Sequence, residues 1–180
     1  AIKNPPEQHL LELIKLYSNG QYQELLISAE SLTKKFSNSS ILFNILGAAN
    51  AALKRFDLAI EKYQKAITLD SKNAEPHNNL GVVMMAKGDL NTAITSLKQA
   101  VSINPDYSEA YSNLGQAYRD NNDLFAAIKT YETLQTVVPS DANVKKNLNF
   151  VKNQAVPAWH LPMMNDERRN KSYSQALKGA

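Results

Sequence analysis

Small apolar residues recur along the chain at an interval of 34 residues, and larger apolar residues fill the positions between them. The small residues are Gly47, Gly81 and Gly115, each preceded by leucine, and Ala59, Ala93 and Ala127. A fixed interval of this length indicates that one structural unit is repeated. Within each unit, a small residue lets one helix approach the next closely, while large residues such as Phe43 and Tyr63 fill the remaining space. The pattern therefore predicts pairs of closely packed helices.

The interval divides the chain into four helix pairs with a segment on either side. After a leader at 1–5, the predicted units are residues 6–39, 40–73, 74–107 and 108–141. A further helix at 142–155 is expected to cap the array, because Leu148 lies one interval after Leu114 but no second helix follows it. The first unit is degenerate, as terminal repeats of such arrays often are. Residues 156–180 do not belong to the repeat.

This pattern resembles the tetratricopeptide repeat family over about three quarters of the chain. A Leu-Gly pair, an alanine, a bulky residue, a second alanine and a closing proline form the signature of that family. Gly20, Gly88 and the Asn121-Asn122 pair mark turns that need a left-handed backbone. The resemblance implies an all-α fold, a right-handed superhelix (α-solenoid) with a capping helix and a C-terminal extension. The first helix of each pair would line its concave face.

Charge and composition exclude several kinds of partner. The net charge is +3, but residues 1–141 carry 13 basic and 15 acidic side chains, while residues 142–180 carry 7 and 2. A basic face for nucleic acid is therefore not expected. No apolar run approaches the ~20 residues of a membrane span. Cysteine is absent, which removes disulfides and thiolate chemistry and fits a reducing compartment, so a cytoplasmic location is expected.

The concave face is predicted to carry a line of asparagines. Positions are counted from the first residue of each unit. Position 6 is Asn79 in the third unit, Asn113 in the fourth and Asn147 in the capping helix, and position 5 is Asn44 in the second unit and Asn78 in the third. Because an amide offers both a donor and an acceptor, such a line can hold an extended peptide backbone without reading its sequence. It is similar to the asparagine ladder in the repeats of O-linked N-acetylglucosamine transferases. The alternative is that these asparagines are only a common consensus of the repeat and bind nothing.

Side chains beside the asparagines are expected to complete the binding groove. Three amide pairs at ~1 kcal/mol each give ~3 kcal/mol, whereas micromolar binding needs ~8 kcal/mol. The candidates at positions 9 and 12 are Tyr17, Met85, Gln116 and Arg119. A receptor for the acidic C-termini of heat-shock chaperones is not expected, because positions 2, 5 and 6 of the four units hold no lysine or arginine. Position 2 is Glu75 in the third unit and Glu109 in the fourth.

Residues 1–155 carry no pattern that predicts catalysis or metal binding. His9 and His77 occupy position 4, where an aromatic ring normally packs between helices, and no His, Asp and Glu cluster has metal-ligand spacing. Asp120 and Asp123 lie at a predicted turn between helices, where aspartate side chains cap helix ends. Asp106, with Glu109 three residues later, predicts a capping box. The chain by itself is not expected to be an enzyme.

Residues 156–180 resemble the helical lead-in to the catalytic domain of protein arginine methyltransferases, most of all those with tetratricopeptide repeats in front. The matching residues are Trp159-His160, Met163, Asn165-Asp166, Arg169-Asn170, Tyr173 and Ala176. The resemblance implies S-adenosylmethionine as the cofactor of a larger parent enzyme, with His160, Met163 and Arg169 at cofactor-binding positions. Arg169 would pair with the cofactor's carboxylate. The glycine-rich strand of that family is not among these residues, so no cofactor is expected for this chain alone.

These observations predict a scaffold that binds an extended peptide or a partner protein in its concave groove. The chain would be the substrate-recruiting region of an S-adenosylmethionine-dependent arginine methyltransferase. Three alternatives remain open: a stand-alone adaptor, an array that self-associates through its cap or tail, and the front end of a glycosyltransferase with similar repeats. Nucleic acid, membranes and metal ions are not expected as partners.

Overall fold

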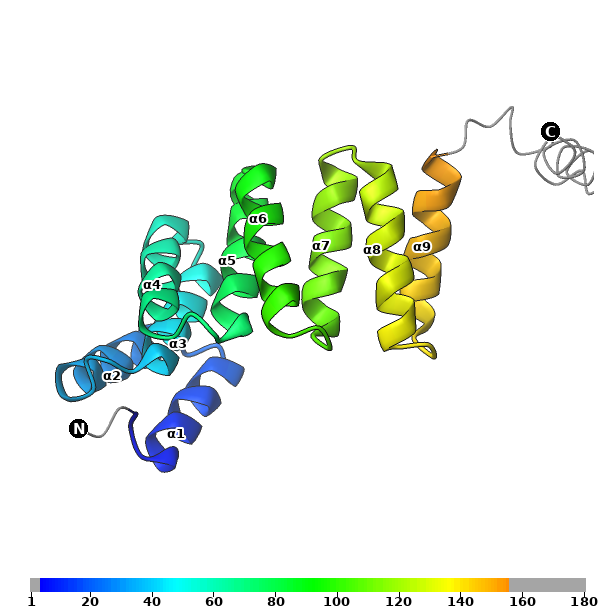
Figure 1. The fold of residues 1–180 in the computed structure, drawn as a ribbon. Helices are drawn as coiled ribbons and strands as arrows, with labels where there is room; N and C mark the ends of the chain where they lie inside the picture. The colour runs from blue at the N-terminus through cyan, green and yellow to red at the C-terminus, as the bar shows by residue number, and fades with distance from the viewer. Residues whose placement is uncertain (1–3, 156–180) are drawn as a thin grey trace, which may run out of the picture.

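The computed structural model describes residues 4–155, which form nine helices and no strand. In order they are α1 (Glu7–Ser18), α2 (Tyr22–Lys35), α3 (Ser40–Ala52), α4 (Phe56–Leu69), α5 (Ala74–Lys87), α6 (Leu90–Ile103), α7 (Ser108–Asp120), α8 (Leu124–Val137) and α9 (Ala142–Ala155). Helices that follow one another in sequence pack against one another, and α5 also contacts α3 and α7. Figure 1 shows the resulting stacked array, with α1 and α9 at opposite ends. The expected all-α repeat solenoid is confirmed.

Close approach within a pair depends on the repeated glycines. A Cβ atom added at Gly47 would lie 2.5 Å from the ring of Tyr63, and one added at Gly115 would lie 2.6 Å from the ring of Tyr131. Both tyrosines are buried on the second helix of their pairs. Each glycine therefore provides the space that the large side chain of the facing helix occupies.

The turns between paired helices adopt a left-handed backbone at one residue. Gly20, Gly88 and Asn122 have φ angles of 74°, 82° and 60°, as the sequence predicts. In the second pair, the same role falls to Lys54, with a φ of 58°, and no glycine or asparagine marks that turn. Sequence reasoning missed Lys54 because a lysine rarely adopts this conformation.

Side-chain caps begin several of the helices, although not all the expected ones form. Asp123 accepts a hydrogen bond from the backbone N–H of Ala126 at 3.0 Å and so caps α8, whereas Asp120 pairs with Arg119. The predicted capping box of Asp106 and Glu109 is wrong. The residue before α7 is Tyr107, which makes no side-chain cap, and Glu109 is used elsewhere.

Within residues 4–155, α9 lies at the C-terminal end of the array. α9 buries one apolar face, formed by Val144, Leu148 and Val151, against α8. The other face of α9 is lysine, asparagine and glutamine, with Phe150 as its one large exposed apolar side chain. A helix that is apolar on one side and polar on the other suits the end of a solenoid.

Candidate functional site

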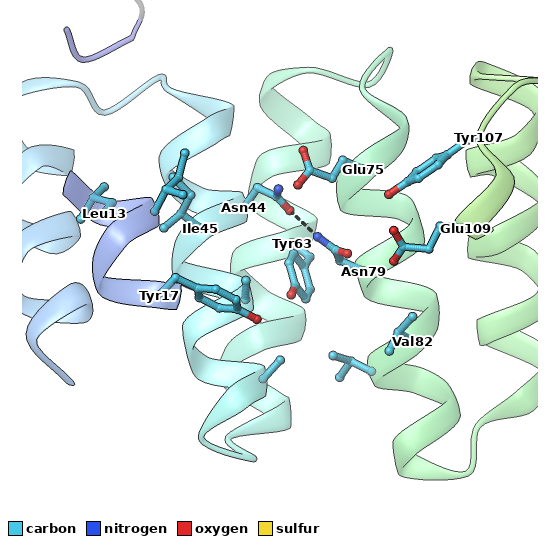
Figure 2. Close-up of a pocket in the computed structure, with 14 residues that line it drawn as sticks. Leu13, Tyr17, Asn44, Ile45, Tyr63, Glu75, Asn79, Val82, Tyr107 and Glu109 are labelled. Carbon is cyan, nitrogen blue, oxygen red and sulfur yellow. Dashed lines mark hydrogen bonds between the residues drawn. The ribbon is translucent and has the colours of Figure 1, made fainter. Parts of the chain in front are cut away.

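The candidate site is a hollow of about 400 Å³ where α1, α3 and α5 come together, with the start of α7 at one end. Figure 2 shows apolar side chains of α1 and α3 on one side and the start of α7 on the other. Three of its large apolar side chains are exposed: Ile14 by 53%, Tyr17 by 40% and Val82 by 41%. The floor includes Tyr63, the ring that packs against Gly47.

Asparagines of adjacent repeats are hydrogen-bonded to each other beside this hollow. The side chain of Asn79 donates to Oδ1 of Asn44 at 3.1 Å, as drawn in Figure 2. In the same way, Asn113 donates to Oδ1 of Asn78 at 2.9 Å. Each bond joins position 6 of one repeat to position 5 of the preceding repeat, 35 residues earlier. Four of the five predicted asparagines, Asn44, Asn78, Asn79 and Asn113, are therefore bonded to one another across adjacent repeats.

This arrangement corrects the predicted role of the position 5 asparagines. Asn44 is 5% exposed and Asn78 is 0% exposed, so both lie between the repeats instead of presenting free amides to the groove. Asn79 and Asn113 are half-buried and keep hydrogen-bonding capacity beyond the one bond that each donates. Asn147 is half-buried and makes no side-chain hydrogen bond within residues 4–155. Its counterpart 35 residues earlier is Ser112.

The other predicted groove residues are not gathered at one place. Tyr17 lines the hollow with Asn44 and Asn79, and its ring lies 5.3 Å from that of Tyr22. Met85 is half-buried, lies outside the hollow and packs against the core formed by α6 and α7. Gln116 is exposed and lies outside the hollow. Arg119 stands near the far end of the array, with its guanidinium 5.8 Å from the ring centre of Phe150.

Sequence reasoning missed the acidic end of the hollow. Glu75 and Glu109 line it from the first turns of α5 and α7, together with Tyr107. Asn78 donates to Oε1 of Glu109 and to the hydroxyl of Tyr107, both at 3.3 Å. A signal is present in the sequence, because the two glutamates are one interval apart at position 2. Only the stacking of the repeats shows that both reach the same hollow.

The carboxylates at the acidic end of the hollow help to raise the pKa values of Tyr107 and Tyr63. Burial, followed by the charges of Glu109 and Glu75, raises the pKa of Tyr107 to about 12. The pKa of Tyr63 is raised as well, first by burial and then by the nearby Tyr17 and Glu75. Both phenols therefore stay neutral and can donate hydrogen bonds across the physiological range. The two carboxylates lie in the first turns of α5 and α7, at the positive ends of these helix dipoles.

His9 and His77, which the sequence predicts to pack between helices in the same way, differ in burial. His77 is half-buried, and its Nε2 atom is buried without a hydrogen-bond partner among the described residues. Burial lowers the pKa of His77, and a backbone hydrogen bond at Ser71 opposes that shift. His9 is exposed, so its expected packing between helices is wrong.

Residues 4–155 contain no group of three His, Asp or Glu side chains placed to hold a metal ion. Within the same range, no helix is both long and apolar enough to cross a membrane. The candidate cofactor residues His160, Met163 and Arg169 lie outside the described residues, as does Trp159.

Comparison with solved structures shows close similarity of fold at low sequence identity. MamA has a TM-score of 0.71 and 21% identity, over 91% of each chain. A thermophilic tetratricopeptide protein of Thermus thermophilus, TTC0263, has a TM-score of 0.72 and 21% identity, over 82% of this chain and 81% of that one. The first tetratricopeptide domain of Spaghetti (RPAP3), bound to the HSP90 peptide SRMEEVD, has a TM-score of 0.62 and 22% identity. The match covers 64% of this chain and 92% of that one. No curated protein sequence matches significantly.

Family models agree with the repeat seen in sequence and structure. A model described as TPR repeat matches residues 47–88 and 84–122, and one described as tetratricopeptide repeat matches residues 108–140. Together the matches run from residue 47 to residue 140, which is more than half of the 180-residue chain. They begin inside α3 and end just beyond α8, so they cover the regular helix pairs. The chain belongs to the tetratricopeptide repeat family.

Proposed function

We propose that the chain acts by binding, as a scaffold whose concave face holds an extended segment of a partner protein. The observation that carries this proposal is the hollow between α1, α3 and α5, where Ile14, Tyr17 and Val82 expose apolar surface together. Apolar side chains that are exposed in one concave place, with polar groups around them, are typical of an interaction site. The solved Spaghetti domain, which has the same fold, was captured with a peptide bound.

Asn79, which lines the hollow, and Asn113, which lies outside it in the next repeat, suit a peptide backbone. Asn79 and Asn113 are half-buried and belong to successive repeats, so a segment running along the array meets one amide per repeat. Their bonds to Asn44 and Asn78 hold both side chains in place before a ligand arrives. A ligand therefore does not have to immobilise them, which reduces the entropic cost of binding.

A bulky residue in the hollow should block the partner. We expect Val82→Trp to weaken peptide binding at least about tenfold, because the indole fills space that the ligand needs. Val82 is 41% exposed, so the larger side chain is tolerated without repacking the core. Leu58→Trp on α4 is the matched control, since Leu58 is 46% exposed and does not line the hollow.

The measurement is binding to an array of immobilised nonapeptides of varied sequence, followed by fluorescence anisotropy with the peptides that bind best. Protein comprising residues 1–180 is used throughout. If no peptide binds the unmodified protein, or if both tryptophan variants bind equally well, the concave hollow is not a peptide site.

We further propose that the chain is the recruiting arm of an S-adenosylmethionine-dependent arginine methyltransferase. The support is the resemblance of Trp159-His160, Met163 and Arg169-Asn170 to the lead-in of that family, directly after a repeat array. We expect the native coding sequence to continue past Ala180 into a strand followed by an Asp-x-Gly-x-Gly turn. Sequencing the gene beyond that codon tests this, and an immediate stop codon would refute it.

A further inference from the structure

We infer that the segment bound in the hollow carries a basic side chain, which sits between Glu75 and Glu109, next to an apolar side chain that packs on α1 and α3. This inference rests on the proposed function, because it states which kind of peptide the hollow takes. Three features of the hollow support it: its charge, the convergence of its two carboxylates, and its division into a polar and an apolar part.

The charge of the hollow is negative and uncompensated. Of the 14 residues that line it, Glu75 and Glu109 are the charged ones, and both are exposed. Within residues 4–155, neither carboxylate lies within 4.0 Å of a lysine, arginine or histidine nitrogen; the four ion pairs of this range are elsewhere. A cationic group is therefore favoured at this place, and an acidic peptide is repelled.

The carboxylates of Glu75 and Glu109 lie near the same residue, Tyr107. They come from the first turns of adjacent helices, α5 and α7, and both raise the pKa of Tyr107. Asn78 donates to Glu109 and to Tyr107, which holds these two side chains next to each other. Figure 2 shows Glu75 and Glu109 on either side of Asn79, with Tyr107 facing them. A guanidinium or ammonium group can donate to several oxygens placed in this way.

The part of the hollow that α1 and α3 form beyond Asn44 is largely apolar. Leu13, Tyr17 and Ile45 lie on the opposite side of the Asn44–Asn79 bond from Glu109, as Figure 2 shows. A peptide that crosses this bond in extended form therefore meets carboxylates on one side and apolar side chains on the other. A ligand with adjacent basic and apolar side chains matches both parts of the hollow. A purely apolar segment or an acidic segment leaves the carboxylates without a cationic partner.

The occupant to which we commit is a segment of another protein. Residues 156–180 also contain basic side chains, but they follow α9, at the far end of the array from α1. The hollow is built from α1, α3, α5 and the start of α7, with Tyr63 of α4 at its floor. The chain's own tail is therefore treated as a competing occupant that the experiment distinguishes.

The test compares residue preferences on the same nonapeptide array. We expect arginine and lysine to be enriched among the peptides that bind the unmodified protein. Glu75→Gln with Glu109→Gln should weaken the best basic peptide about tenfold, since two partly exposed ion pairs are lost, and should remove most of the salt dependence. Glu30→Gln with Glu61→Gln is the matched control. It changes the net charge equally at exposed positions on α2 and α4, outside the hollow.

Each outcome bears on a different statement. Binding of neutral or acidic peptides with no basic preference, or equal affinity of the two double variants, would overturn the inference while leaving the proposed function intact. Binding of no peptide at all would contradict the proposed function itself. A synthetic peptide of residues 156–180 that binds more tightly than the array peptides, with the same dependence on Glu75 and Glu109, would assign the hollow to the chain's own tail and overturn the inference of an external partner.

Discussion

Gly81→Ala is expected to lower the free energy of unfolding by about 2 kcal/mol, even though alanine is the better helix former. The added Cβ atom would lie 2.5 Å from Cγ of Leu97 and 2.9 Å from its Cδ2. Leu97 is 0% exposed and packs against α7 as well as α5, so it has no free space to move into. The helices of the pair must separate, which costs more than the helix propensity that alanine contributes.

The cause can be isolated with a double-mutant cycle monitored by urea denaturation. Leu97→Ala alone should cost about 3 kcal/mol through the cavity that it leaves. Combined with Gly81→Ala, it removes the atoms that clash, so the two effects should fall short of additivity by about 1–2 kcal/mol. Gly88→Ala serves as the control, because no atom lies within 4 Å of the added Cβ and its cost comes only from the φ of +82°. Strict additivity of Gly81→Ala and Leu97→Ala would refute a steric origin.

This steric relation explains why the fold could be predicted from the sequence. The space next to Gly47, Gly81 or Gly115 is filled by a residue on the facing helix, sixteen positions later in each case. Such a constraint acts within one helix pair and repeats with the unit, so it appears directly as an interval in the sequence. The degenerate first pair lacks it, yet Leu13 of α1 and Leu25 of α2 are still buried there.

The features that could not be predicted depend on how one pair is placed on the next. Asn79 bonds to a residue 35 positions earlier, one more than the repeat interval, and only the offset between stacked repeats brings position 6 opposite position 5. The same offset buries Asn78 and brings Glu109 towards the hollow. The left-handed conformation of Lys54 could not be predicted for a different reason. Lys54 is exposed, and the turn that ends α3, closed by the bond from Arg55 N–H to the Asn50 carbonyl, requires this conformation of a residue that does not favour it.

Asn78→Ala is expected to lower the free energy of unfolding by about 2–3 kcal/mol, the largest effect among the asparagines of the ladder. Asn78 is 0% exposed, accepts from Asn113 at 2.9 Å and donates to both Tyr107 and Glu109. Its removal leaves a small cavity and breaks the link between α5 and α7. Asn79→Ala is the matched control on the neighbouring residue. It should cost about 1 kcal/mol, because Asn79 is half-buried and water can replace its bond to Asn44.

Asn78 also connects stability to recognition, because the same amide joins the repeats and holds the acidic end of the hollow. We expect Asn78→Ala to weaken binding of a basic peptide several-fold, because Glu109 and Tyr107 lose their common donor. The comparison uses variant protein that is still folded by circular dichroism. Asn113→Ala removes the bond that Asn78 accepts but leaves the Asn78 donor in place, so it should affect stability more than peptide affinity. Equal losses of peptide affinity in the two variants would show that Asn78 acts on the groove only through the packing of the repeats.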